Sequence, residues 1–201
     1  MEYIFFLGRT PALSLAEIRA MLEKYRIGCE AVLVESGFLI LKTQEPLPVR
    51  DFFVQMGGTL KMAEVLGRTN AGDVRAAIVS SIKESLKEKP GKKSIGYSIY
   101  FTKKNRKEKE EQAREYFRGL FSKIKRDELG DLSIRIVYPL PGESALSTAT
   151  VFNNRLPNPG KGMEFDIIMD GRDIILGRTL IVQDIEPFAC RGSSAGYYLS
   201  E

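Results

Sequence analysis

The first 68 residues follow an alternation of apolar patterns that constrains the fold more than any other feature of the chain. Continuous or alternating apolar runs predict strands, and apolar residues that recur every three or four positions predict helices. The first helix is predicted to open with a capping box, because Glu17 follows Ser14 by three residues. The predicted order is a strand at 2–7, a helix at 14–25, two strands within 31–43, a helix at 48–56 and a strand at 59–67. This βαββαβ order predicts a ferredoxin-like domain over residues 1–68.

The remaining residues predict a second, α/β domain, so the expected fold class is α+β. Its long helix is predicted to start at an N-cap residue, Asn105, with Glu108 three positions on. Of two tyrosines on the preceding strand, one is predicted in the core and one on the surface, in preference to two stacking platforms; Tyr97 shares a face with Ile95 and Ile99. The predicted elements are a helix at 73–87, strands at 94–101, 132–139, 163–170 and 172–185, and a long helix with a buried stripe of Ala113, Tyr116, Phe117, Leu120, Phe121 and Ile124.

The sequence carries no motif of a known catalytic site. It has no phosphate-binding G-x-x-x-x-G-K-[ST] loop, no dinucleotide-binding glycine fingerprint and no histidine. With two cysteines far apart, zinc sites of the usual kind are excluded. The pair Asp166 and Asp170 could serve acid–base chemistry, but such pairs are more often solvated. We therefore expect a binding module, with no catalytic residue, metal or cofactor held by these residues.

No apolar run approaches the length that spans a bilayer, and the N-terminus lacks the pattern of a signal peptide. These features predict a cytoplasmic protein without a membrane partner, in which Cys29 and Cys190 are ordinary thiols.

Positive charge is concentrated in one segment. Residues 83–126 hold eleven lysines and four arginines against six glutamates, a charge of +9, whereas the whole chain carries +4. This distribution fits either a polyanion-binding surface or a solvated helix face with Glu/Lys pairs, and charge alone does not decide between them. Basic residues flank the strand at 94–101, and the helix start after it could accept phosphate. Arg135 and Arg155 could reach the same ligand from neighbouring elements.

Three stretches together resemble a known family. They are "FLGRTPALSLAEIRAML" with "QMGGTLKMAEVLG", "ALSTATVFNNRL", and "ILGRTLIVQDIEPFACR". They resemble the N-terminal part of the THUMP-containing tRNA guanine-N2 methyltransferases, with Thr148 where the family has a second serine. The resemblance runs from about Tyr3 to Arg191, and the chain departs from the family after that residue.

The resemblance implies a ferredoxin-like domain at 1–68, a THUMP RNA-binding domain at 69–185, and a linker remnant at 186–201. It also implies that the methyltransferase domain, which would bind S-adenosylmethionine, is absent from this chain. A truncated gene, a split enzyme with a separate methyltransferase subunit, and a shortened form of a longer protein all remain open.

THUMP domains grip the single-stranded 3′ end of tRNA, so the resemblance implies a tRNA-binding module that recognises the acceptor (CCA) end and positions tRNA for N2-methylation of guanine. One alternative is the RNA-binding part of a THUMP enzyme of thiolation, deamination or pseudouridylation. Another is a protein-interaction or dimerisation adaptor without RNA binding. The predicted RNA-binding residues are Lys93, Lys103, Lys104, Arg106, Lys107, Arg135, Ser147, Asn153, Arg155 and Lys161.

Overall fold

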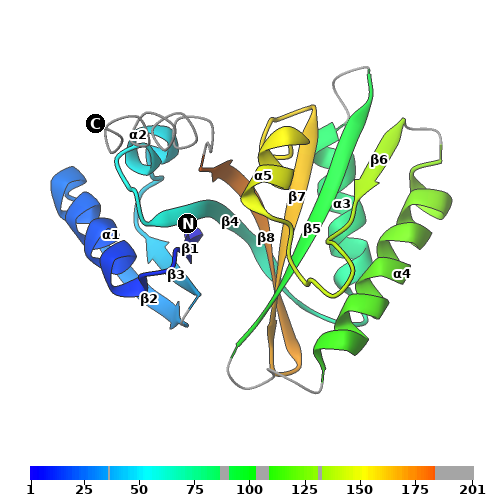
Figure 1. The fold of residues 1–201 in the computed structure, drawn as a ribbon, viewed down its shortest axis with the longest axis horizontal. Helices are drawn as coiled ribbons and strands as arrows, with labels where there is room; N and C mark the ends of the chain where they lie inside the picture. Colours follow the sequence, from blue (N-terminus) through cyan, green and yellow to red (C-terminus); the bar gives the residue numbers. More distant parts are fainter. Residues whose placement is uncertain (36, 87–90, 103–108, 131–132, 184–201) are drawn as a thin grey trace, which may run out of the picture.

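The computed structural model describes residues 1–35, 37–86, 91–102, 109–130 and 133–183. Within these residues, one mixed sheet of eight strands runs through the molecule in the order β2-β3-β1-β4-β8-β7-β5-β6 (Figure 1). Strand β5 is parallel to both of its neighbours, β6 and β7, and the other pairs are antiparallel. The predicted α+β fold class is confirmed.

The first half of the chain has the βαββαβ order that its sequence predicts. Its strands take the order β2-β3-β1-β4, which is the ferredoxin-like arrangement. Strand β4 continues to Asn70 and pairs with β8, so the predicted boundary after residue 68 falls inside a strand, and the division into two domains stays a prediction. The elements are β1 (Glu2–Leu7), α1 (Pro11–Tyr25), β2 (Cys29–Val34), β3 (Phe38–Thr43), α2 (Val49–Phe53) and β4 (Thr59–Asn70).

The second half packs two helices on one face of its strands and a short helix on the other. On the strand at Lys93–Phe101, one face is buried against the helices at Val74–Leu86 and Glu110–Glu128 through Ile95, Tyr97 and Ile99. The Tyr97 ring stacks on Phe121, with ring centroids 4.5 Å apart. The elements are α3 (Val74–Leu86), β5 (Lys93–Phe101), α4 (Glu110–Glu128), β6 (Ile134–Val137), α5 (Thr148–Asn153), β7 (Gly162–Asp170) and β8 (Asp173–Val182).

The sheet is strongly curled, so strands β1 and β5, from its two halves, approach each other across the inner face. Phe6 of β1 and Tyr100 of β5 have ring centroids 4.4 Å apart, although three strands separate β1 from β5 in the sheet. In a flat sheet those strands would lie about 19 Å apart, at about 4.8 Å per strand. The inner face closes over an aromatic cluster to which Phe38 also belongs. Helices α1 and α4 lie on the outside, at opposite sides of Figure 1.

The predicted capping box at the start of the first helix is wrong. Helix α1 begins at Pro11, and its N-cap residue Thr10 makes no side-chain cap. The Ser14 hydroxyl instead donates to the Gly58 carbonyl at 2.6 Å, and the Glu17 carboxylate accepts from the Gly58 backbone N–H at 2.8 Å. The Ser14 and Glu17 pair thus fastens the turn before β4, because Pro11 starts the helix one turn earlier and turns both side chains toward that loop.

Three other predictions in the second half need correction. Helix α4 starts at Glu110 with Lys109 at the N-cap position, which replaces Asn105; Asn105 itself lies outside the described residues. Tyr116 is 44% exposed and donates to the Ala71 carbonyl, so it borders the buried stripe instead of belonging to it. Tyr100 is half-buried against the inner aromatic cluster instead of lying on the surface. No helix in the described part of the chain has the length and apolarity to cross a membrane.

Candidate nucleic-acid interface

The segment from Ser144 to Leu156, which carries α5, is fastened to the inner face of β5. The Ile99 backbone N–H donates to the Ser144 carbonyl at 2.7 Å, and the Leu146 N–H donates to the Ser98 hydroxyl at 2.9 Å. A Cβ on Gly96 would lie 2.5 Å from Leu156 and 2.7 Å from Leu146. The glycine therefore leaves the space in which these two leucines pack down on the strand.

Helix α5 is capped at both ends. At its start, the Ser147 hydroxyl accepts from the Thr150 N–H at 3.1 Å. At its end, the Arg155 N–H donates to the Phe152 carbonyl and the Leu156 N–H donates to the Val151 carbonyl, which is the Schellman arrangement. Ser147, predicted as an RNA-binding residue, thus has a structural role as N-cap, and its side chain is exposed.

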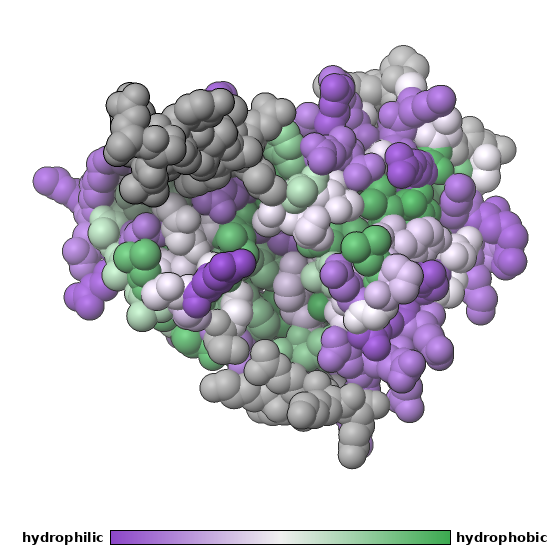
Figure 2. Space-filling model, in the orientation of Figure 1, coloured by the Kyte–Doolittle hydropathy of each residue, from purple (hydrophilic) through white to green (hydrophobic). Residues whose placement is uncertain are grey.

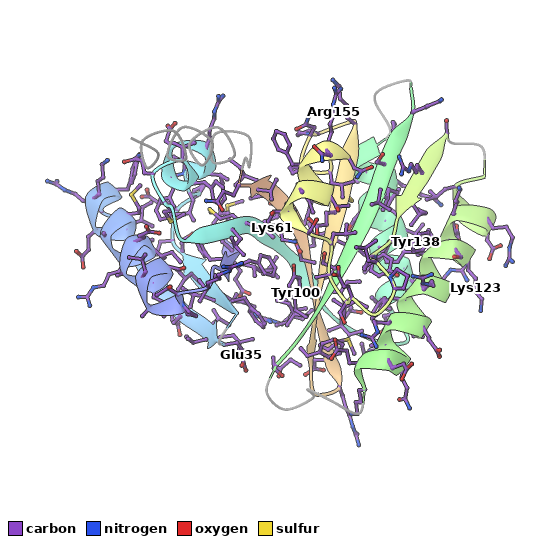
Figure 3. All side chains as sticks on the ribbon, in the orientation of Figure 1. Glu35, Lys61, Tyr100, Lys123, Tyr138 and Arg155 are labelled. Carbon is purple, nitrogen blue, oxygen red and sulfur yellow. The ribbon has the colours of Figure 1, made fainter. Side chains whose placement is uncertain are left out.

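Arg155 occupies the left-handed backbone position of this cap, with φ 54°. Glycine is the usual residue there, because a side chain in this conformation costs about 1 kcal/mol or more. The Arg155 side chain is exposed, and within the described residues it makes no hydrogen bond or ion pair. Figure 3 shows Arg155 at the top of the molecule, beside α5. Arg26 at the end of α1 has the same backbone conformation, with φ 55°, so what distinguishes Arg155 is its place beside a cleft.

A cleft of about 540 Å³ adjoins Arg155. Its floor is apolar and comes from the end of β8, at Leu180, Ile181 and Val182. Its rim combines an aromatic ring, two amide side chains and a guanidinium. These rim residues are Phe152, Asn153, Asn158 and Arg155. Phe152 is 38% exposed. The cleft therefore offers a flat apolar surface beside donors and acceptors, which is the combination that holds an unstacked base.

Three further predicted residues lie at one edge of the sheet. Strands β5, β6 and β7 are parallel, so they all begin at the same edge, at the top of Figure 1. Lys93 opens β5, Arg135 is the second residue of β6, and Lys161 directly precedes β7. Arg135 and Lys161 are exposed, whereas Lys93 is buried. Gly162, next to Lys161, sits against the Arg155 carbonyl, so this edge is continuous with the cap of α5.

The four remaining predicted basic residues belong to the segment that follows β5 in the sequence. Lys103, Lys104, Arg106 and Lys107 lie outside the described residues, and they follow the far end of β5. Strand β5 has nine residues, so Phe101 at its end is about 26 Å from Lys93 at its start. The prediction that Arg135 and Arg155 reach the same ligand as Lys103, Lys104, Arg106 and Lys107 stays a prediction, because the last four lie outside the described residues.

Figure 2 shows that apolar atoms gather in the middle of this face, between the two halves, and that hydrophilic atoms cover α4. Lys123 and Lys125 of α4 are thus exposed on a solvated helix face, which is one of the two explanations proposed for the positive charge of residues 83–126. Tyr138 and Arg118 make a cation–π contact on the same side, with 5.4 Å from the guanidinium carbon to the ring centroid.

Below α5, on the inner face, lies a cluster of charged side chains with almost no exposure. Lys61 of β4 lies 2.8 Å from Glu164 and 2.6 Å from Asp166, both of β7. The Ser98 hydroxyl contacts Glu164 at 2.6 Å, and the Thr179 hydroxyl lies 2.7 Å from Glu164 and 2.6 Å from Asp166. Asp166 is therefore buried and paired with Lys61, contrary to its expected solvation with Asp170.

The contacts of Thr179 require a shared proton. Its hydroxyl has one hydrogen, yet it touches a carboxyl oxygen of Glu164 and another of Asp166. It can therefore hydrogen-bond to both oxygens only when one of the two carboxyls is protonated. Burial raises the pKa of Asp166 to about 7, with Lys61 opposing the rise and Glu164 adding to it. Burial lowers the pKa of Lys61, but the two carboxylates outweigh burial and raise it well above the ordinary value.

Phe152 and Lys61 are functional candidates that the sequence prediction missed. Phe152 follows Ser147 on a short helix and gave no periodic signal, because α5 has only six residues. Lys61 did carry a signal: it lies between two apolar residues in a strand, and Glu164 and Asp166 alternate on one face of another strand. Among the described residues, no three side chains of metal-ligating type come together.

No protein-family model and no curated protein sequence matches the chain. Among solved structures, the fold is similar to that of PH1313 from Pyrococcus horikoshii Ot3, with a TM-score of 0.53 and 13% identity. The match covers 88% of this chain and 53% of that chain, so this chain spans about half the length of PH1313.

Two further structures overlap at lower scores. A 4-thiouridine synthetase in an RNA complex with bound ATP has a TM-score of 0.49 and 11% identity, over 88% of this chain and 40% of that chain. TrmN from Thermus thermophilus has a TM-score of 0.47 and 10% identity, over 91% of this chain and 46% of that chain. At these identities, what is shown is the fold that the chain shares with PH1313.

Proposed function

We propose that the protein is an RNA-binding module of the THUMP type, whose ligand is the single-stranded 3′ end of tRNA. The α5 cleft and the basic edge beside it form the proposed interface. The observation that carries this proposal is Arg155: an unpaired, exposed arginine held in a strained backbone conformation at the rim of an apolar cleft. The sequence resemblance to THUMP-containing proteins supports the same conclusion.

The rim residues suit an unpaired nucleotide. The Phe152 ring can stack on a base, and the amides of Asn153 and Asn158 can donate to and accept from its edge. The Arg155 guanidinium can hold a phosphate through two parallel hydrogen bonds or stack on a neighbouring base. A base within a duplex has no free face for Phe152, so this arrangement favours single-stranded RNA over double-stranded RNA.

The basic edge, formed by the exposed side chains of Arg135 and Lys161, suits the phosphates of the nucleotides next to the one bound in the cleft. Arg135 and Lys161 lie on the strand starts next to the α5 cap, where the backbone of a strand leaving the cleft would run. Contacts to phosphate fix position and carry no sequence information. Selection of the acceptor end would therefore depend on the cleft, and overall affinity on the edge.

In the family that the sequence resembles, tRNA bound in this way is presented to a catalytic domain. The finer proposal is that these residues serve N2-methylation of guanine by a methyltransferase domain that binds S-adenosylmethionine and lies outside these 201 residues.

The direct test is binding of the purified chain to one tRNA transcript, intact and with its 3′ CCA removed, at two salt concentrations. We expect trimming to weaken binding by at least tenfold, and the affinity for intact tRNA to fall as salt rises. Equal binding of both transcripts would reject acceptor-end recognition and leave a generic basic surface. No binding to either transcript would reject the RNA-binding function and favour a protein-interaction adaptor.

A further inference from the structure

Among the hydrogen bonds of the described residues, the ionic cluster of Lys61, Glu164 and Asp166 is linked to the α5 segment through the Ser98 hydroxyl. Ser98 is fully buried on β5. Its oxygen accepts from the Leu146 backbone N–H at 2.9 Å and its hydrogen is directed to Glu164 at 2.6 Å. Leu146 directly precedes Ser147, the N-cap of α5. The Ser98 hydroxyl thus connects the residue before the N-cap of α5 to the buried charges.

The same cluster reaches into the first half of the chain. Lys61 belongs to β4 and lies 4.6 Å from the ring centroid of Phe6, on β1. Its ammonium is held between two carboxylates of β7 and is 4% exposed. Because the sheet curls at this point, movement of β1 and β4 against β7 would have to displace a buried ion pair, which is costly. Figure 3 shows Lys61 and Tyr100 in the middle of the molecule, with α5 above them.

We propose that Ser98 is a positioning residue for RNA recognition: through its hydroxyl, the buried Lys61–Glu164 pair holds the start of α5, and thereby the cleft rim, in its binding geometry. This inference rests on the proposed RNA-binding function. It assigns a role in recognition to a residue that would not touch RNA. Without the hydroxyl, the Leu146 N–H would be buried with no acceptor from β5, and the segment would gain by moving toward water.

Thr179 provides a matched control. Its hydroxyl is also buried and also contacts Glu164, at the other carboxyl oxygen, but among the described residues it makes no hydrogen bond to the α5 segment. Ser98→Ala and Thr179→Val therefore each remove one hydroxyl from the same carboxylate. Only Ser98→Ala removes the connection to Leu146. If the cluster acts solely as a stability element, both variants will have similar effects on every measurement.

The experiment compares wild type, S98A and T179V by amide hydrogen exchange without RNA, by thermal unfolding, and by tRNA affinity. We expect exchange within residues 144–156 to accelerate at least fivefold in S98A and to match wild type in T179V, although both variants unfold at lower temperature. We expect tRNA affinity to fall about 5- to 10-fold in S98A and less than twofold in T179V.

Three results separate the possible errors. Unchanged exchange at 144–156 in S98A would overturn the positioning role. Equal effects of S98A and T179V on exchange and on affinity would overturn it as well, in favour of a general loss of stability. Faster exchange in S98A alone, with tRNA affinity unchanged, would support the structural connection and reject α5 as part of the RNA interface, which is a failure of the proposed function.

Discussion

The Nζ atom of Lys61 lies 2.6 Å from Oδ1 of Asp166, and this contact joins β4 to β7 across the intervening strand β8. The two residues are 105 positions apart in sequence and both are buried. Two carboxyl groups face one ammonium, so the cluster contains an unbalanced negative charge unless one carboxyl holds a proton. This composition makes the fold sensitive to pH.

The stability of the protein should decrease as the pH rises toward 7. The pKa of Asp166 is about 7 in the folded protein, chiefly because of burial, against about 3.9 in an unfolded chain. The folded state therefore keeps a proton that the unfolded state loses, and this stabilisation is complete below about pH 4 and lost as the pH rises through 7. The slope would be at most about 1.4 kcal/mol per pH unit. Asp166→Asn cannot titrate, so its melting temperature should lack this decrease.

The measurement is thermal unfolding of wild type and D166N at a series of pH values between about 4 and 8. The difference between the two curves isolates Asp166, because the other titrating groups are common to both proteins. Lys61, Glu164 and Thr179 face Asp166; Lys61 and the Thr179 hydrogen bond oppose the rise in its pKa, and Glu164 adds to it. Parallel curves would show that Asp166 does not carry the shared proton.

Arg155→Gly should raise stability and reduce tRNA affinity. Glycine relieves the left-handed strain at φ 54°, a gain of about 1 kcal/mol, and removes the guanidinium from the cleft. We expect affinity to fall about tenfold. Arg26 is a matched control, because it is exposed, has φ 55° and ends α1 in the same way. R26G should gain similar stability and keep its affinity; a loss of affinity in both variants would contradict a specific role for Arg155.

The double variant Arg135→Glu and Lys161→Glu should weaken binding to every tRNA by a similar factor. Both side chains are exposed at the edge where β6 and β7 begin. If each neutralises one phosphate, the slope of log affinity against log salt should become less steep by about 1 to 2. Lys123→Glu with Lys125→Glu changes the net charge equally on α4 and should leave the slope nearly unchanged. Equal changes in both doubles would indicate a nonspecific effect of net charge.

Gly162→Ala should destabilise the α5 segment. A Cβ at this position would lie 2.5 Å from the Arg155 carbonyl oxygen and 2.8 Å from the Leu156 Cα, and neither backbone atom can move independently. We expect a loss of about 1–3 kcal/mol in unfolding free energy. Gly119→Ala is the control, because a Cβ there meets nothing within 4 Å and the position is inside α4. It should gain about 0.5–1 kcal/mol. Equal stability of G162A and wild type would show that the α5 loop can shift.

Prediction from the sequence succeeded where the signal is local. Val74, Ile78 and Ile82 recur at helical spacing and are fully buried on α3, and Ile95, Tyr97 and Ile99 alternate along β5 and face the same core. Periodicity identifies the type of element and its buried face, because both depend on side-chain direction along one segment. The predictions of Ser14 and Asn105 as N-cap residues failed, because periodicity does not fix the residue at which a helix starts.

The candidate site depended on information that local patterns do not contain. The chemical types of Arg155 and Asn153 are visible in the sequence, as is the basic character of residues 83–126. Two features of the site are not visible there: the positive φ of Arg155 and the cleft that α5 forms with β8. Both depend on how segments far apart in the chain pack together.

The sequence by itself determined the order and type of the elements and the chemistry of the exposed side chains, because each residue carries these properties independently of its partners. The tertiary structure alone decided that β4 and β8 pair, that the sheet curls until Phe6 meets Tyr100, and that Lys61 lies between Glu164 and Asp166. Pairing, register and burial are properties of residues far apart in the chain, and they are set when apolar faces from both halves are buried together.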